Sequence, residues 1–398
     1  MIIVKSTLLW AVAIVTAAAL LVATDYRSRD ADSSLYARLS GELARQPVSR
    51  WIAPEWNGAW NQQGLFREHP VGILLPSAAL VRTGVPDGQA AYIVNMVYQA
   101  AVLALLPLVA SVVMSGVEAR SLGWLLQLLP VAFVYRIRGN QEQPVLMCFL
   151  ALLYGTHRAR SNPAWIVLMA AACCALVLIK GAFAMFALVS AALWLVLVRT
   201  SRDGTSKADL WAWAGLGVAV TAAGLMMLGY EALYVRTTGE SFLEFYRSTR
   251  LGESMDLGDP RVVTHALANV VWYLLRLAWF AAPWSLVAFA VVYQLVRTRM
   301  QSRVPSVFDS ISAAGVWWAL LTTVVFIAVL SPANVRAERF IFPTYFIVAS
   351  VGVAAVSRRS ESFARFVART DGQRWLPPAV WLLTLMLSLG SRLVGVRP

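Results

Sequence analysis

The sequence predicts an all-α integral membrane protein, and two observations lead to that class. Of the 398 residues, 59% are hydrophobic and only 14% are charged, with a mean hydropathy of +0.64. Apolar runs of about bilayer-spanning length recur along the whole chain. The runs are continuous rather than alternating, which excludes a β-barrel, and no polar stretch is long enough for a soluble domain. We expect one transmembrane domain over residues 1–398, with loops and no separate soluble domain.

The first apolar run, residues 8–24, predicts a retained membrane helix. It is longer than a typical signal-peptide core, lacks a small-residue cleavage pattern before Asp25, and follows Lys5. We therefore place the N-terminus in the cytoplasm. Ten further runs bring the expected total to about eleven spans. They cover residues 91–114, 122–135, 144–157, 164–180, 182–198, 210–233, 267–296, 311–331, 341–357 and 379–396.

The loop charges agree with this alternation, because the loops assigned to the cytoplasm are basic and the opposite loops hold most of the acids. Functional chemistry is therefore expected on the extracytoplasmic face, and the short loops favour a bacterial inner membrane. The net charge of +13 reflects topology and lipid headgroups, so we expect no nucleic-acid partner. The basic cytoplasmic side chains include Arg158, Arg160, Arg199, Arg202, Lys207, Arg297, Arg299, Arg303, Arg358, Arg359, Arg365, Arg369 and Arg374.

The cysteines and histidines predict neither disulfides nor a zinc site. All three cysteines lie inside apolar runs, and the three histidines are distributed over separate loops. A bound divalent cation would need carboxylates instead, and the acidic first outer loop is where it would bind.

Two outer loops are long enough to build a site. In the first, residues 25–90, Leu35, Leu39 and Leu43 recur at helical spacing and predict an amphipathic helix lying on the membrane. Tryptophans suited to the headgroup level follow, and residues 72–81 predict a second short helix. The second loop, residues 234–266, carries aromatic side chains among charges and is expected to cover a substrate cavity. The tryptophans are Trp51, Trp56 and Trp60.

Asp30 and Asp32 directly follow the first span, which places carboxylates at the water-membrane boundary. A membrane enzyme would keep its base there. Asp32 is also a good N-cap for the helix that begins at Ser33, and the two roles are compatible. Asp30 fits equally well as a solvated loop residue.

Several cations stand near apolar runs on the same outer side. Lys180 ends the 164–180 run, where an ammonium in hydrocarbon costs about 2.5–3.5 kcal/mol unless it reaches the interface or an anion. Snorkelling is the simpler explanation, but Gly181 permits a tight reversal that would turn Lys180 into a cavity. Arg138 and Glu142 lie between two apolar runs, and Arg339 precedes another. The ordinary explanation for each is that a charged residue marks the end of a helix. Together, these cations beside an acidic loop suit a lipid-linked phosphate and an acceptor that loses a proton.

In this order the motifs resemble those of the GT-C membrane glycosyltransferases, in the branch with the protein O-mannosyltransferases and the lipid A aminoarabinose transferase. Asp32-Ser33 and Tyr36-Ala37 stand where that branch has Asp-Glu and a Tyr-Ala helix. Three further motifs of that branch have counterparts in the same order along this chain, and an acidic segment before Pro144 stands where the branch often has an acidic residue. They are Glu68-His69-Pro70 for Lys/His-Pro-Pro, Ile179-Lys180-Gly181 for Thr-Lys-Gly, Arg339-Phe340 with Pro343 for Arg-Tyr with proline, and Asn140-Gln141-Glu142-Gln143-Pro144. Ser33, Val71 and Phe340 depart from the pattern.

The resemblance implies inverting transfer of a hexosyl or pentosyl unit from a polyprenyl-phosphate donor to a glycan, lipid or protein acceptor. Asp32 would be the base, with Asp30 beside it. No cofactor is implied with certainty, and the acidic loop leaves room for a divalent cation. The implied donor-phosphate ligands are Lys180, Arg339 and Arg138, and the implied substrate contacts are Tyr36, Glu68, His69 and Glu142.

Two alternatives stay open. A transporter or flippase for a lipid-linked saccharide would have a similar cationic cavity, although the sequence shows neither an internal repeat nor paired interrupted spans. A polysaccharide polymerase or ligase would be expected to rely on arginine-rich outer loops, whereas here the first outer loop is acidic.

Overall fold

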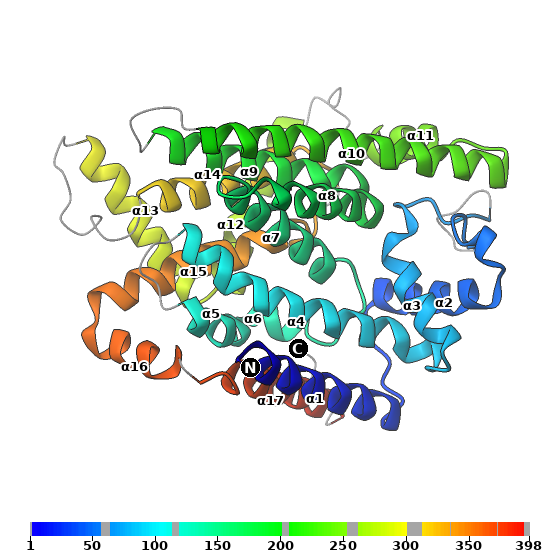
Figure 1. The fold of residues 1–398 in the computed structure, drawn as a ribbon, viewed down its shortest axis with the longest axis horizontal. Helices are drawn as coiled ribbons and strands as arrows, with labels where there is room; N and C mark the ends of the chain where they lie inside the picture. Colours follow the sequence, from blue (N-terminus) through cyan, green and yellow to red (C-terminus); the bar gives the residue numbers. More distant parts are fainter. Residues whose placement is uncertain are drawn as a thin grey trace.

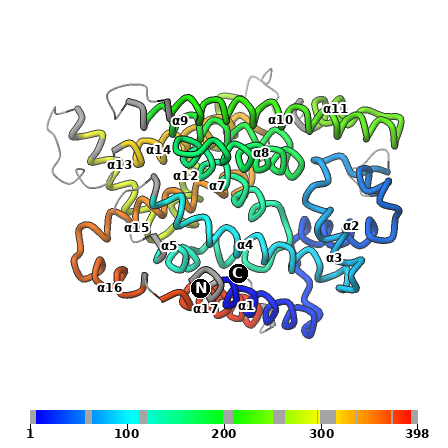
Figure 2. Tube along the Cα trace, viewed as in Figure 1, coloured from blue at the N-terminus to red at the C-terminus, as the bar shows by residue number. Residues whose placement is uncertain are grey.

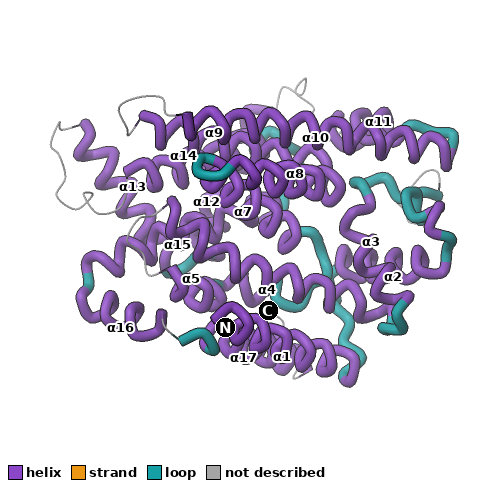
Figure 3. Tube along the Cα trace, in the orientation of Figure 1, coloured by secondary structure: helices purple, strands orange, loops and turns teal. Residues whose placement is uncertain are grey.

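The computed structural model describes residues 2–56, 64–113, 119–200, 207–252, 262–300, 313–334, 336–371 and 373–393. Within these ranges the chain is helical and forms no strand (Figure 3) apart from one isolated bridge between Glu55 and Leu65. The predicted all-α class is therefore confirmed. Trp60 and part of the 234–266 loop lie outside the described residues.

The helices follow the apolar runs closely (Figure 1), since most runs contain one helix and end at polar or turn-forming residues. Their bounds are α1 Ile2–Ala23, α2 Ala31–Arg45, α3 Leu74–Arg82, α4 Asp87–Val113, α5 Ala119–Leu125, α6 Pro130–Val134, α7 Glu142–Ala159, α8 Ile166–Lys180, α9 Ala184–Thr200, α10 Lys207–Thr238, α11 Phe242–Phe245, α12 Val262–Phe280, α13 Trp284–Met300, α14 Ala313–Leu330, α15 Phe342–Arg359, α16 Glu361–Asp371 and α17 Leu376–Leu393.

The long helices run roughly along one axis, with α2, α3 and α11 at one end of the molecule and α16 at the other (Figure 1). Five segments of the described chain are long and apolar enough to cross a membrane, which makes the chain an integral membrane protein. The total of about eleven spans stays a prediction. The five segments are Asp87–Ser111, Pro163–Leu197, Asp209–Thr238, Val262–Phe280 and Glu338–Arg359.

Two predicted runs are not continuous helices. The 267–296 run divides into α12 and α13 at Pro283, and the 122–135 run divides into α5, a 3₁₀ turn and α6, which begins at Pro130. Proline has no N–H to donate and restricts the residue before it, so Leu129 adopts an extended conformation with ψ 143°. Hydropathy alone could not locate these breaks, because the flanking residues are equally apolar.

Two apolar cores hold the helices together. The larger one joins α2 through α16, and α13 approaches α15 so closely that a Cβ at Gly352 would overlap the Trp284 carbonyl. The smaller one packs α1 against α4 and α17, with the Trp10 and Trp381 rings 5.9 Å apart. Figure 2 shows α1 and α17 side by side, although they lie at opposite ends of the sequence.

The helix predicted to lie on the membrane packs within the protein. In α2, the side chains of Leu39 and Leu43 are fully buried, and the helix contacts α3 and α4. The predicted helical spacing of the leucines is present in α2, and two of them pack against the protein's own helices. The position of the helix at the membrane surface stays a prediction. This packing fixes the position of the first turn of α2, which carries Asp32.

Candidate functional site

The first turn of α2 is organised by Asp30 rather than by Asp32. One Asp30 oxygen, Oδ2, accepts hydrogen bonds from the backbone N–H of Ser33, at 3.1 Å, and from its hydroxyl, at 2.7 Å. Asp30 is therefore the N-cap. The capping role considered for Asp32 is therefore wrong. Asp32 is the second residue of α2, and its carboxylate does not cap the helix.

Asp32 lines a cavity of about 540 Å³ at this end of the molecule. Tyr36 lies one helical turn later and lines the same cavity, because residues four apart share a helix face. The remaining charged and histidine side chains of the wall come from distant segments: Glu68, His69, Lys180 and Arg339. Six of the nine site residues proposed from the sequence therefore share one cavity.

Arg339 connects two walls of this cavity. It lies in the 3₁₀ turn Glu338–Ile341, and its guanidinium contacts the Asp32 carboxylate. Both side chains keep about a third of their surface exposed, at 33% and 30%. The acid and the cation therefore meet at an accessible surface, where each has further hydrogen-bonding positions for a ligand.

Lys180 enters the cavity from the C-terminal end of α8. Its ammonium lies 3.8 Å from Glu142 Oε1 and stacks on the rings of Phe183 and Phe340, at 4.9 and 5.7 Å. Glu142 is 2% exposed, does not line the cavity, and leaves its Oε2 without a hydrogen-bond partner in the described part of the chain. Glu142 therefore pairs with Lys180 on the side of the ammonium away from the cavity lining.

Gly181 sets the direction of Lys180. Its φ of 56° and ψ of −125° suit glycine, and the chain reverses there into α9. A Cβ at this position would lie 2.7 Å from the Tyr246 hydroxyl, so side-chain space is also lacking. The turn expected from the sequence is present, and it explains how a lysine at the end of an apolar helix faces a cavity.

We expect Gly181→Ala to destabilise the protein by about 1–3 kcal/mol, because alanine is strained at this backbone conformation. Gly217→Ala is the matched control, since a Cβ there meets nothing within 4 Å and alanine favours the helix. Thermal unfolding of both purified variants measures the difference. A Gly181→Ala protein as stable as Gly217→Ala would contradict the argument.

Asp30 and Arg138 form a second pair behind Asp32. Arg138 Nη1 lies 3.2 Å from Asp30 Oδ1, and its guanidinium stacks 4.5 Å above the Tyr135 ring. The Ser33 hydroxyl also accepts a bond from the Gly139 N–H at 3.1 Å. Neither Asp30 nor Arg138 lines the cavity. These contacts, including those of Ser33, attach the start of α2 to the segment before α7.

His69 has a defined hydrogen-bonding pattern. Its Nδ1 lies 2.8 Å from the Pro70 carbonyl oxygen, and its Nε2 lies 2.9 Å from the Tyr36 hydroxyl. The carbonyl can only accept, so Nδ1 carries a proton, and in the neutral ring Nε2 then accepts from Tyr36. Both side chains are buried to within a few per cent and belong to an aromatic cluster with Phe66.

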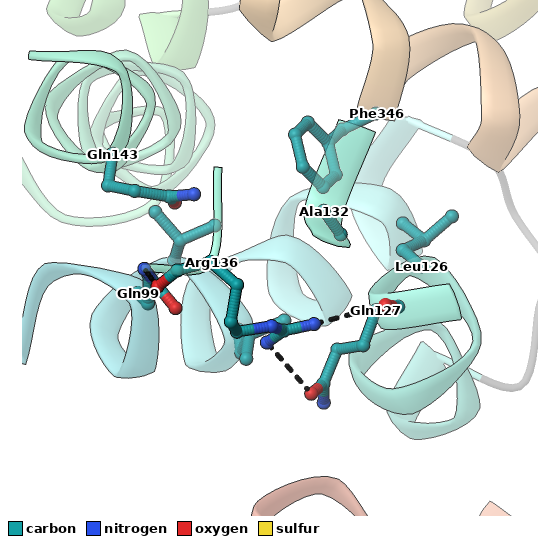
Figure 4. A pocket seen from close by; sticks show the side chains of 9 residues that line it. Gln99, Leu126, Gln127, Ala132, Arg136, Gln143 and Phe346 are labelled. Carbon is teal, nitrogen blue, oxygen red and sulfur yellow. Dashed lines mark hydrogen bonds between the residues drawn. The ribbon is translucent and has the colours of Figure 1, made fainter. Parts of the chain in front are cut away.

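Arg136 does not join the site, although the sequence places it beside Arg138. Its guanidinium is buried and donates to the carbonyl and side-chain oxygens of Gln127, at 3.0 and 3.4 Å. It borders a separate cavity of about 20 Å³, which Gln99 and Gln143 also line (Figure 4). Burial lowers the pKa of this guanidinium.

Two further polar residues, Gln141 and Tyr246, line the cavity and were not proposed as site residues. Gln141 belongs to the 140–144 segment singled out in the sequence, and Tyr246 belongs to the 234–266 loop expected to cover a cavity. The apolar end of the cavity was not predicted. The far wall is apolar and comes from α9 and α14, through residues that look like ordinary membrane-span positions. They are Met185, Phe186, Val189, Val325, Val329 and Leu330.

The described residues offer no metal site, because none of their His, Cys, Asp and Glu side chains form a cluster of three or more. Asp32 and Glu68 both line the cavity, and Asp32 already contacts Arg339. The charged side chains of the cavity wall are therefore two carboxylates and two cations, and one of each, Asp32 and Arg339, are in contact.

No protein-family model matches the sequence, and no curated protein is significantly similar to it. Solved structures do share its fold. ArnT from Cupriavidus metallidurans bound to undecaprenyl phosphate aligns with a TM-score of 0.64 at 15% identity, over 98% of this chain and 77% of that one. Its apo form gives 0.60 at 15% identity, over 97% and 76%. The apo oligosaccharyltransferase from Archaeoglobus fulgidus gives 0.54 at 10% identity, over 96% and 56%.

Proposed function

We propose that this chain, which has the GT-C fold of ArnT and the archaeal oligosaccharyltransferase, is a membrane glycosyltransferase. It would move one sugar from a polyprenyl-phosphate donor to an acceptor on the extracytoplasmic face of a bacterial inner membrane. The observation that carries the proposal is the single cavity that holds the Asp32 carboxylate, Lys180 and Arg339 at a polar end and continues into an apolar wall.

The donor's two chemical parts match the two ends of the cavity. A phosphate suits the Lys180 ammonium and the Arg339 guanidinium, because both donate charge-assisted hydrogen bonds and the phosphate oxygens accept them. An isoprenoid chain suits the apolar wall formed by α9 and α14. The likeness to ArnT bound to undecaprenyl phosphate supports this assignment. A volume of about 540 Å³ is of the size that small-molecule sites have.

The proposed step needs one base and one stabilised leaving group. The acceptor hydroxyl gives its proton to Asp32 as its oxygen bonds to the anomeric carbon, and the bond from that carbon to the phosphate oxygen breaks. The electron pair leaves with polyprenyl phosphate, which gains negative charge beside Lys180 and Arg339 and needs no proton. Attack from the face opposite the phosphate inverts the anomeric centre.

Arg339 ties the two halves of this step together. Its guanidinium carries five N–H donors, so it can hold Asp32 and a donor phosphate at once. This shared cation would orient the carboxylate relative to the leaving group. Asp30, through its cap and its pair with Arg138, would act as a positioning residue for Asp32 rather than as a second base.

Tyr36, His69 and Glu68 would contact the sugar or the acceptor. The Tyr36 hydroxyl donates to His69 Nε2, so its oxygen can still accept a hydrogen bond from a ligand in the cavity that it lines. Glu68 adds a carboxylate on the same wall. Which sugar these groups select depends on a few contacts in the cavity, which the fold does not dictate.

A flippase or transporter is the competing function, because it would also need a cationic cavity beside an apolar wall. The two functions differ in chemistry, since a transporter leaves the bond between sugar and phosphate intact. A polymerase or ligase differs in its acceptor, which would be a second lipid-linked glycan.

The experiment is transfer by the purified full chain in sealed proteoliposomes, with a panel of radiolabelled polyprenyl-phosphate sugars and extracted membrane lipids, glycans and proteins as acceptors. We expect one donor to be consumed, with its label recovered on an acceptor and free polyprenyl phosphate released. Donor that crosses the bilayer with its glycosidic bond intact would reject transfer in favour of the flippase.

A further inference from the structure

Arg276 is a charged residue in an unusual place. It lies within α12, one of the five segments long and apolar enough to cross a membrane, and its side chain is partly exposed. An arginine within such a segment is costly unless it meets water, a partner or an anion. Intramembrane arginines therefore mark positions where a specific group is bound.

The surroundings of Arg276 include a second cation, Arg336, and one acid, Glu338. Its guanidinium carbon lies 5.0 Å from the centroid of the Trp272 ring, and that of Arg336 lies 5.8 Å from the same ring. In the described part of the chain, neither guanidinium forms an ion pair with a carboxylate. Glu338 is the acid close to this group, and its Oε1 accepts from the Tyr135 hydroxyl at 3.5 Å.

Stacking on an indole attracts a guanidinium but leaves its charge in place. Two such charges around one ring repel each other, and the surrounding apolar helix surface weakens their screening by water. A doubly hydrogen-bonding anion would offset the repulsion, and the planar donors of arginine match the oxygens of a phosphate.

The surface next to these arginines is apolar and open. On α12, the side chains of Val271, Leu275 and Trp279 are 57%, 65% and 67% exposed. They lie on the same helix as Arg276 and suit acyl chains, while the arginines suit a headgroup. A molecule with a phosphate at one end and hydrocarbon at the other meets both requirements.

This surface is distinct from the large cavity. Arg276, Trp272 and Arg336 do not line that cavity, whereas Arg339, three residues after Arg336, does. The short segment before α15 therefore presents one arginine to the donor cavity and another to the α12 surface.

We propose that Arg276, Arg336 and Trp272 bind the phosphate headgroup of an anionic membrane phospholipid, whose acyl chains lie along the exposed face of α12. The site is independent of the proposed sugar transfer, because it uses none of the residues assigned to that reaction.

The test measures lipid retention by native mass spectrometry on the purified full chain, exchanged into detergent with phosphatidylglycerol or phosphatidylcholine. We expect the wild type to prefer phosphatidylglycerol, and Arg276→Gln and Arg336→Gln each to weaken that preference about fivefold, or about 25-fold together. Arg236→Gln is the matched control, since Arg236 is an exposed arginine near the end of another apolar helix, α10. Circular dichroism and thermal unfolding check that each variant is folded.

Three outcomes would overturn the proposal. The wild type could bind the two lipids equally, the folded double variant could keep the wild-type preference, or Arg236→Gln could lose as much as the double variant. In a further measurement, excess inorganic phosphate is added to the lipid-bound protein. Full displacement of the lipid by phosphate would assign the site to a free anion. None of these outcomes bears on sugar transfer, which is assayed separately.

Discussion

Asp32→Asn is expected to lower sugar transfer by about a hundred- to ten-thousandfold, the usual contribution of a positioned base. Asparagine has almost the same shape as aspartate, and its side-chain oxygen still accepts from Arg339, so the fold should persist. The loss should appear in the rate at saturating donor, because the amide cannot take the acceptor's proton. Initial rates with the donor identified in the panel, together with thermal unfolding, measure both effects.

Asp30→Asn is the matched control for that result. Asparagine caps helices as well as aspartate does, and Asp30 does not line the cavity. We expect this variant to retain most of the activity despite its weakened contact with Arg138. If Asp32→Asn is folded and fully active, Asp32 is not the base and the flippase becomes the better hypothesis.

Replacing Lys180 by methionine should damage stability and activity for two separable reasons. The buried carboxylate of Glu142 loses its cation, and an unpaired buried charge typically costs about 3–5 kcal/mol. The donor phosphate also loses a cation, which by comparison with other anion-stabilising donors lowers the rate about a hundred- to a thousandfold.

The double variant Lys180→Met with Glu142→Leu separates the two effects. Replacing a buried ion pair with apolar residues is often neutral for stability, so we expect thermal unfolding close to that of the wild type. Transfer should nevertheless stay low, because the cavity still lacks the ammonium. Recovery of activity along with stability would show that Lys180 acts only in the fold, and an unstable but active single variant would do the same.

Figure 1 shows the all-α fold that the sequence predicted. The fold class was predictable from the sequence, whereas the packing of the helices was not. Hydrophobic runs are a local property of the chain, so they predicted the all-α class and most of the helices directly. Pro283 marks the division of the 267–296 run, although the hydropathy of the flanking residues does not. The placement of α13 after that break depends on its packing against α15, where Gly352 meets Trp284. Such packing is a property of distant segments and leaves no signal in a window of apolar residues.

The candidate site divides in the same way. The sequence by itself determined the chemistry, because Asp32, Lys180 and Arg339 are charged residues at the ends of apolar runs, where burial makes a charge costly unless it has a partner. The tertiary structure decided the partners. It brought Arg339 to Asp32 across more than three hundred residues, gave the cap to Asp30, placed Glu142 behind Lys180, and buried Arg136 elsewhere. Those pairings follow from the packing of α2, α8 and the turn before α15, because a charge is satisfied by whatever the fold places next to it in space.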